Sequence, residues 1–346
     1  MTDPRVSVVI PSYNRPQPLA RCLEALARQS MPRDAFEVVV VDDGGSAPLD
    51  PIAAAVSSRI DLRILGQPNA GPAAARNHGV REARAPRIAF TDDDCVPRPD
   101  WLERLLARAE ARPGALIGGQ SSNGLPDDLL AEANQLIIEL VYEHFNRDPE
   151  NARFFASNNM LVPRDRILAI GGFDEGFPRA GAEDRDFCDR WRAAGFPLVA
   201  CPDARIEHFH AQSLGKFLDL HDRYGRGAYL YQAKRKQRGT GTMGDDLCFH
   251  GTLVRQVWKR LGDRIAWSRA VPMAAALGLW QVANAVGFLR QAGEAKRAGS
   301  RSSGGEPQGG DQRHASRGSV APSLTVSGPP STPRRASAAS TRPSEP

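Results

Sequence analysis

Three consecutive aspartates, Asp92, Asp93 and Asp94, follow an apolar run that ends at Phe90. Three adjacent carboxylates repel one another, and a buried strand cannot hold them without partners. A strand end that faces a cleft can hold them if a divalent cation binds there, because Mg²⁺ and Mn²⁺ prefer carboxylate oxygen and keep positions for water and phosphate. The triplet therefore predicts a metal–phosphate site. The alternative is an acidic surface turn, since aspartate is common in turns.

Two further polar clusters follow apolar runs in the first half of the chain. Residues 6–10 lead into Pro11-Ser12-Tyr13-Asn14, and residues 36–41 lead into Asp42-Asp43. Strand-like runs alternate with helical patterns here, which indicates an α/β fold with a mostly parallel central sheet flanked by helices. Because such sheets bind ligands beyond the carboxyl ends of their strands, we expect these clusters and the aspartates to converge in one cleft.

The second half of the chain holds acids and histidines that could do chemistry. Glu183 and Asp184 precede a helical pattern at 186–194. A pair of carboxylates can supply a general base, although acids at a helix N-terminus are also favoured by the helix dipole alone. His208 and His210 flank Phe209, so both would lie on one face of an extended segment. Either one could ligate a metal, and the alternative is a structural histidine.

Six motifs occur in a fixed order along residues 5–212. They are VSVVIPSYNR (6–15), VVVVDDGG (38–45), NAGPAAARNHG (69–79), FTDDD (90–94), GGFDE (171–175) and AEDRDF (182–187). Together they resemble the family 2 glycosyltransferases, which have the GT-A nucleotide-sugar-binding fold. The resemblance implies an inverting, metal-dependent enzyme that moves a sugar from a nucleotide-sugar donor, UDP-linked in our reading, to an acceptor hydroxyl.

The resemblance also implies a metal site. Asp92 and Asp94 match the Asp-x-Asp motif, which in this family binds Mg²⁺ or Mn²⁺ on the donor diphosphate. We expect Asp94 to ligate the metal directly and Asp92 to lie nearer the ribose or a metal-bound water. Asp93 is expected to point away, because alternate residues of an extended segment face opposite sides. A histidine completes the site, with His208 preferred over His210.

Donor contacts are expected from all three strand ends and from the helix after Gly71-Pro72. The predicted donor-binding residues are Pro11, Tyr13, Asp42, Asp43, Arg76, Asp92 and Asn159. Asp42 or Asp43 can accept a hydrogen bond from a base N–H or a ribose hydroxyl. Arg76 lies near a helix N-terminus, which favours phosphate, although a solvated helix face is an equal alternative.

The acceptor side is assigned to the Glu-Asp pair. Asp184 is the predicted base that deprotonates the acceptor hydroxyl, and Glu183 is predicted to bind the acceptor. The acceptor is expected to be a glycan or a lipid-linked glycan of the cell envelope. A sugar-phosphate nucleotidyltransferase is an alternative, but it needs a glycine-rich basic loop where this chain has Pro-Ser-Tyr-Asn-Arg-Pro. A non-catalytic nucleotide-sugar-binding scaffold is a second alternative, which would lack the base or a metal acid.

Four regions are expected along the chain. They are a GT-A domain (1–212), a helical extension (213–265), an apolar helix (266–292) and a disordered basic tail rich in Ser, Pro and Gly (293–346). The apolar stretch 271–289 contains Pro272, Gln281 and Asn284, so it predicts either peripheral membrane contact or a soluble packing helix.

Charge and cysteine content limit the partners and the compartment. The net charge is +5, and residues 291–346 carry eight Lys/Arg against four Asp/Glu, so most of the excess belongs to the tail. No specific nucleic-acid partner is expected. Five widely spaced cysteines without a Cys-x-x-Cys, and no signal-like start, favour the cytoplasm, with the inner face of the cell membrane as a further place.

Overall fold

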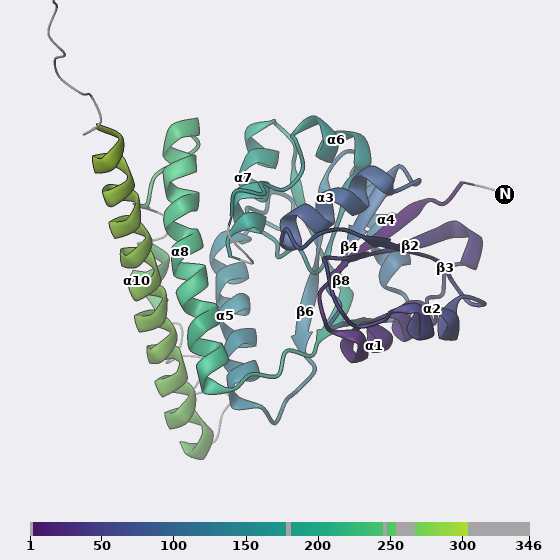
Figure 1. The fold of residues 1–346 in the computed structure, drawn as a ribbon, viewed down its shortest axis with the longest axis horizontal. Coiled ribbons are helices and arrows are strands. Elements are labelled where there is room, and N and C mark those ends of the chain that lie inside the picture. The colour runs from purple at the N-terminus through teal and green to yellow at the C-terminus, as the bar shows by residue number, and fades with distance from the viewer. Residues whose placement is uncertain (1–2, 178–180, 245–247, 254–266, 304–346) are drawn as a thin grey trace, which may run out of the picture. The chain divides into compact units, whose positions relative to one another are not determined.

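The computed structural model describes residues 3–177, 181–244, 248–253 and 267–303 (Figure 1). Strands are β1 (Val6–Ser12), β2 (Phe36–Asp42), β3 (Asp61–Gly66), β4 (Arg87–Phe90), β5 (Cys95–Pro97), β6 (Leu116–Asn123), β7 (Met160–Pro163) and β8 (Leu198–His208). Helices are α1 (Pro16–Leu26), α2 (Asp50–Val56), α3 (Pro72–Glu82), α4 (Trp101–Ala111), α5 (Leu129–Phe145), α6 (Arg164–Ala169), α7 (Glu183–Ala193), α8 (Leu214–Arg238) and α10 (Trp267–Ser303), with a short 3-10 turn at Arg33–Ala35.

The strands form one eight-stranded sheet in the order β3-β2-β1-β4-β7-β6-β8-β5. Strands β1 to β4 pair in parallel, as do β6 and β8, whereas β7 runs antiparallel to both β4 and β6, and β5 antiparallel to β8. The predicted mostly parallel sheet with flanking helices is therefore confirmed. The apolar runs of β1 and β2 are buried on both faces, which is why valine dominates them.

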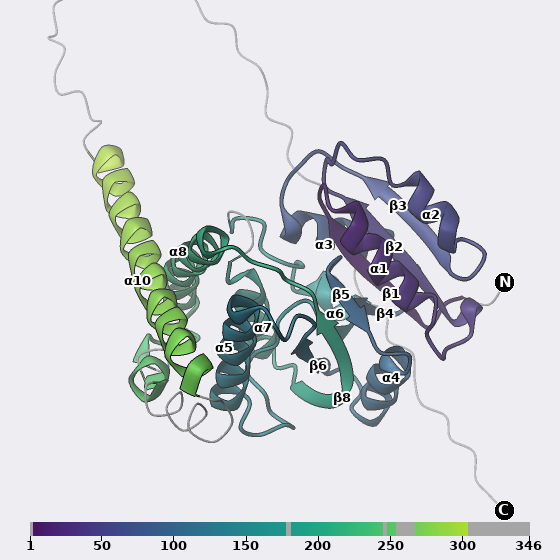
Figure 2. The same ribbon diagram turned by 90° about the horizontal axis from the view of Figure 1, so that it is seen from below.

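Alternate strand residues enter two separate cores, one on each face of the sheet. Val8 and Ile10 of β1 belong to the core shared with helices α1, α2 and α4, whereas Val9 belongs to the core shared with α3, α6 and α7. Helices α1 and α3 accordingly lie on opposite faces of the sheet (Figures 1 and 2). Helix α3 comes especially close, because a Cβ on Gly79 would lie 2.4 Å from Val9 Cγ1. This close approach places Arg76, one turn earlier in α3, beside the carboxyl ends of the strands.

Helices α5, α8 and α10 lie side by side (Figure 1), and their apolar residues form a third core that includes Leu140, Phe217 and Trp280. Helix α10 continues to Ser303, so residues 293–303 are helical and not part of a disordered tail as predicted. The reason is local: residues 294–298 are Glu, Ala, Lys, Arg and Ala, which favour helix, and Glu294 pairs with Arg226 of α8. The rest of the predicted tail, 304–346, lies outside the described residues.

Candidate active site

The three aspartates occupy a tight turn between β4 and β5, in which the Cys95 amide donates to the Asp92 carbonyl. The side chain of Asp92 is 29% exposed, whereas those of Asp93 and Asp94 are 5% and 3% exposed. A surface turn would leave all three carboxylates in water. Burial of two of them means that they must have partners inside the protein, which excludes the simple acidic-turn alternative.

The carboxylate of Asp94 contacts side chains from two distant parts of the chain. Its Oδ1 lies 3.1 Å from His208 Nε2, and its Oδ2 lies 3.1 Å from His210 Nδ1. Burial opposes ionisation of this carboxyl, but His208, His210 and Arg15 outweigh it and hold the pKa of Asp94 well below its usual range. Burial likewise disfavours a charged imidazole, yet Asp94 raises the pKa of His208. Both predicted histidines therefore reach the aspartate.

Arg15, at the end of the first motif, bridges two of the aspartates. Its Nη1 lies 2.9 Å from Asp93 Oδ1, and its Nη2 donates to Asp94 Oδ2 at 2.8 Å. Asp93 also accepts from the Ser12 hydroxyl at 2.9 Å. The prediction that Asp93 points away from Asp94 is therefore wrong. Alternation of side chains holds for extended backbone, and these residues form a turn.

The donor set around Asp94 fits a divalent cation. Single ligand atoms of Asp94, Cys95 and His208 lie within 4.8 Å of one another. Carboxylate oxygen and imidazole nitrogen suit Mn²⁺, whereas Mg²⁺ favours oxygen. Cys95 is fully buried, and burial raises the pKa of its thiol well above the usual value, which disfavours the thiolate form that binds metals. Asp94 and His208 are the residues that would hold the metal, with Asp92 at the exposed side.

Arg76 links the metal-side acids to the base-side acids. Its Nη2 donates to Asp92 Oδ1 at 2.7 Å, and its Nη1 lies 3.4 Å from Glu183 Oε1. The residue is only 4% exposed, so its charge is balanced by these carboxylates inside the protein. Sequence reasoning placed Arg76 on phosphate through the helix N-terminus; in this structure its described partners are carboxylates.

Glu183 and Asp184 open helix α7 and differ in their surroundings. Glu183 is buried, and its Oε2 accepts from the Gly181 amide at 2.7 Å in addition to the contact with Arg76. Asp184 is half-buried and accepts from the adjacent Arg185 amide. Desolvation and the neighbouring charge of Glu183 raise the pKa of Asp184 to about 7. A carboxylate with a pKa near neutrality is matched to general base catalysis.

Helix α8 closes this side of the site. A Cβ on Gly227 would lie 2.1 Å from the Gly181 carbonyl oxygen, so only glycine lets α8 approach the segment before Glu183. Tyr224 of α8 also lies beside this segment, because a Cβ on Gly181 would lie 3.8 Å from its Cδ1. Ala182, between Gly181 and Glu183, has φ 69°, an uncommon conformation for a residue with a side chain.

The strand ends of β1 and β2 meet as expected. The Asp43 amide donates to the Ser12 carbonyl, and Asn14 Oδ1 accepts from the Ser46 amide. Asp42 Oδ1 accepts from the Gly45 amide, which closes the turn after β2. Together with the Ser12–Asp93 bond, these contacts bring all three polar clusters together at one edge of the sheet.

The remaining predicted donor residues differ in availability. Asp43 already accepts three hydrogen bonds, from Gln67 Nε2 and from the amides of Ala70 and Gly71. It therefore holds the segment before α3. Tyr13 is 49% exposed and Pro11 is partly exposed, so both remain open to a ligand.

Asn159 does not reach the donor surface, which corrects its predicted role. Its side chain is fully buried: Oδ1 accepts from Trp101 Nε1, and Nδ2 donates to the carbonyls of Gln120 and Ala204. These bonds support the irregular pairing of β6 with β8 near Gly119. Burial and complete hydrogen bonding make Asn159 a support of the sheet.

Sequence reasoning did not assign a role to Arg15 or Asn77, although both belong to motifs that it recognised. Asn77 exchanges hydrogen bonds with the backbone of Phe173 and donates to Glu175. The GGFDE motif is thereby attached to α3, one residue from Arg76. The available signal for both was their position inside the motifs at 6–15 and 69–79.

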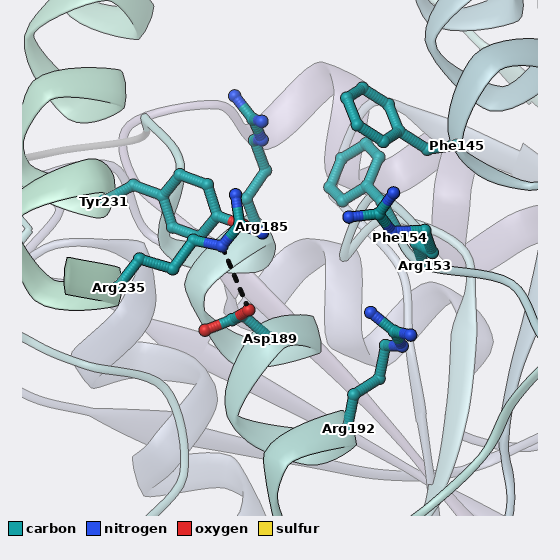
Figure 3. A pocket seen from close by; sticks show the side chains of 8 residues that line it. All are labelled: Phe145, Arg153, Phe154, Arg185, Asp189, Arg192, Tyr231 and Arg235. Atoms are coloured by element: carbon teal, nitrogen blue, oxygen red, sulfur yellow. Dashed lines mark ion pairs between the residues drawn. The ribbon is translucent and has the colours of Figure 1, made fainter. Parts of the chain in front are cut away.

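A separate pocket lies beside α7, between α5 and α8 (Figure 3). It is lined by Phe145, Arg153, Phe154, Arg185, Asp189, Arg192, Tyr231 and Arg235. Asp189 lies 3.4 Å from Arg235 Nε and also pairs with Arg238 at 2.9 Å. None of the lining residues belongs to the acid cluster described above, so this pocket is not the predicted donor site.

Comparison with known families and proteins agrees with this geometry. The family model described as Glycosyl transferase family 2 matches residues 7–167. A second family model, described as N-terminal domain of galactosyltransferase, matches residues 137–212. Glycosyltransferase AglE from Haloferax volcanii is 30% identical over 233 residues, which are 65% of this chain and 73% of that protein. Validoxylamine A glucosyltransferase from Streptomyces hygroscopicus is 29% identical over 256 residues. That match covers 64% of this chain but only 61% of the Streptomyces protein.

Solved structures show the same fold at lower identity. The mannosyltransferase PcManGT from Pyrobaculum calidifontis, in complex with GDP-Man and Mn²⁺, superposes with a TM-score of 0.60 at 18% identity over 84% of this chain and 88% of that one. GalNAc-T7 with UDP, GalNAc and Mn²⁺ gives 0.51 at 14% identity, covering 72% and 54% of the two chains. The fold is therefore GT-A, and by its sequence matches and its ordered motifs the chain belongs to glycosyl transferase family 2.

Proposed function

We propose that the protein transfers a sugar from a nucleoside-diphosphate donor to an acceptor hydroxyl, with inversion at the anomeric carbon. The observation that carries this proposal is the position of Arg76. It joins Asp92 of the Asp-x-Asp turn to Glu183 of the acceptor-side pair at 2.7 and 3.4 Å. Acids suited to a metal-bound diphosphate and acids suited to proton abstraction thus share one site, as a single displacement requires.

The donor is assigned to the strand ends. Asp42 and the exposed ring of Tyr13 are available to the base and ribose, and the diphosphate lies towards Asp92 and Asp94. We propose a UDP-linked sugar, since a uracil N–H can donate to Asp42. Bound at Asp94 and His208, Mn²⁺ or Mg²⁺ would neutralise charge on the departing diphosphate. Arg15 supplies a further cation on the same side.

Asp184 performs the proton transfer. Its carboxylate accepts the proton of the acceptor hydroxyl while that oxygen bonds to the anomeric carbon. The bond from the anomeric carbon to the diphosphate oxygen breaks, and its electron pair leaves with the diphosphate. Glu183 is held by Arg76 and the Gly181 amide, so it positions the acceptor side and does not compete for the proton. The proposed acceptor is a glycan or a lipid-linked glycan, and the proposed compartment of the reaction is the cytoplasm.

The decisive experiment measures nucleoside diphosphate release from a panel of UDP and GDP sugars, with and without Mn²⁺. Asp184→Asn should abolish release and leave donor binding, measured by calorimetry, within about threefold of wild type. Asp165→Asn, an exposed acid on α6, is the matched control and should retain full activity. Donor binding without Mn²⁺-dependent release for any sugar would favour the scaffold alternative. Release of pyrophosphate from a nucleoside triphosphate and a sugar phosphate would favour a nucleotidyltransferase.

A further inference from the structure

Helix α10 presents an apolar face that no described element covers. Val271, Val282 and Leu289 are 67%, 61% and 68% exposed, and Leu279 and Val286 are also exposed. Positions 271, 275, 278, 282, 285 and 289 recur every three or four residues, so they lie on one side of the helix. From 270 to 289 the sequence contains no Asp, Glu, Lys or Arg. The apolar face therefore extends over roughly 30 Å.

The opposite face of α10 is held firmly against the rest of the protein. Met273, Leu277 and Trp280 are buried in the core shared with α5 and α8. A Cβ on Gly287 would lie 2.0 Å from the Asp222 carbonyl oxygen, so the backbones of α10 and α8 are in close contact. The outer face is therefore exposed even though the helix itself is packed against α5 and α8.

Within the described residues, α10 is the one helix long and apolar enough to cross a membrane. Its contacts with α8 argue against crossing. Arg290 and Arg226 form ion pairs between these helices, with Asp222 at 2.8 Å and with Glu294 at 3.0 Å. Insertion of α10 through hydrocarbon would either break these pairs or bury the charged helix α8 with it. A helix lying along a surface keeps them in water.

The charges that follow the apolar face indicate its occupant. Arg290, Lys296 and Arg297 come after the face, and Lys296 lies on the same side of the helix as Leu289, seven residues earlier. Arg269 precedes the face but donates to the Pro126 carbonyl. Two copies of the chain meeting in parallel through this face would bring like cations together, whereas anionic lipid headgroups can pair with them, and each cation near such a surface favours binding.

We propose that the exposed face of α10 docks on the surface of an anionic lipid bilayer. The apolar side chains enter the boundary between headgroups and acyl chains, and the flanking cations contact the headgroups. This inference does not depend on the proposed glycosyl transfer, since it is carried by α10 alone. It would place the transferase beside acceptors that are themselves anchored in the bilayer.

The test is co-sedimentation of the full chain with vesicles. Wild type should bind vesicles that contain phosphatidylglycerol, and this binding should weaken as the salt concentration rises. Binding to vesicles made only of phosphatidylcholine should be weaker. The Val282→Glu/Leu289→Glu variant should lose at least about tenfold in partition. Leu168→Glu, at an apolar residue of α6 that is 44% exposed, is the matched control and should bind within about twofold of wild type.

Two measurements keep the outcome interpretable. Melting temperature and donor binding without vesicles should be the same for wild type and Val282→Glu/Leu289→Glu, because both side chains are exposed on the outer face of α10. Failure to bind anionic vesicles would overturn the proposal. Sedimentation velocity that shows a wild-type dimer, dissociated by the double substitution, would assign the face to a second copy and would overturn it as well.

Discussion

The guanidinium of Arg76 donates to Asp92 Oδ1 at 2.7 Å from a position that is almost fully buried. The same side chain reaches Glu183, 107 residues further along the chain. The pairing couples the turn after β4 to the N-terminus of α7, so a change at Arg76 should affect both sides of the reaction.

Arg76→Lys should lower kcat by roughly 10²-fold, because one ammonium cannot bridge two carboxylates as a planar guanidinium does. Initial rates of nucleoside diphosphate release check this. Arg76→Met should instead destabilise the fold, by about 3–5 kcal/mol, since buried carboxylates lose their partner. Arg81→Lys, on the exposed side of the same helix, is the control. Equal rates for Arg76→Lys and Arg81→Lys would remove Arg76 from the site.

The pH profile should report Asp184. Its pKa is raised to about 7, and a general base must be ionised, so kcat should fall about tenfold per pH unit below that value. Initial rates from pH 5 to pH 9 at saturating donor and Mn²⁺ measure the profile. A flat profile across this range would contradict the assignment of the base.

The same raised pKa makes a stability prediction. A carboxyl whose pKa is raised by folding stabilises the protein below its unfolded pKa, and this contribution is lost as pH rises through about 7. Asp184→Asn removes the ionisation, so the variant should gain stability relative to wild type as pH rises from 5 to 8. Urea unfolding at the two pH values tests the sign; a relative loss of stability at pH 8 would be the contrary result.

Metal affinity should distinguish the two histidines. His208→Gln should weaken Mn²⁺ binding by at least about tenfold, and His210→Gln should have a smaller effect, because His208 shares the three-residue ligand set with Asp94. Binding should also weaken as pH falls, since the raised pKa of His208 makes its proton compete with the metal. Calorimetric titration of Mn²⁺ provides the measurement. A larger loss in His210→Gln would exchange the roles.

Asn159 should behave as a structural residue. Asn159→Ala removes the hydrogen bonds to the Gln120 carbonyl and to two buried partners, Trp101 Nε1 and the Ala204 carbonyl, and should cost at least about 2 kcal/mol of unfolding free energy, while donor KM stays unchanged. Asn158→Ala, next to it, removes a long hydrogen bond of 3.4 Å from the Ser121 hydroxyl and should cost less. A stable Asn159→Ala protein with a raised donor KM would restore the donor-binding role.

Local patterns were sufficient for much of the fold. The valine-rich runs at 6–10 and 36–41 are strands β1 and β2, because β-branched residues buried on both faces suit a parallel sheet. The Asp triplet and the Glu-Asp pair also lie where sequence placed them, at a strand end and a helix start. Strands β5, β6, β7 and β8 were missed, because they are short or broken by polar residues.

The partners of those acids were decided by tertiary structure alone. Arg15 and Asp94 are 79 residues apart, and His210 and Asp94 are 116 apart, so no local pattern could pair them. Sequence by itself determined which residue types end each strand, and hence the family and the class of chemistry. Only the packed fold decided that Asp93 shares Arg15, that Asn159 is buried and that Asp184 is desolvated, because burial and charge pairing depend on residues brought together across the sheet.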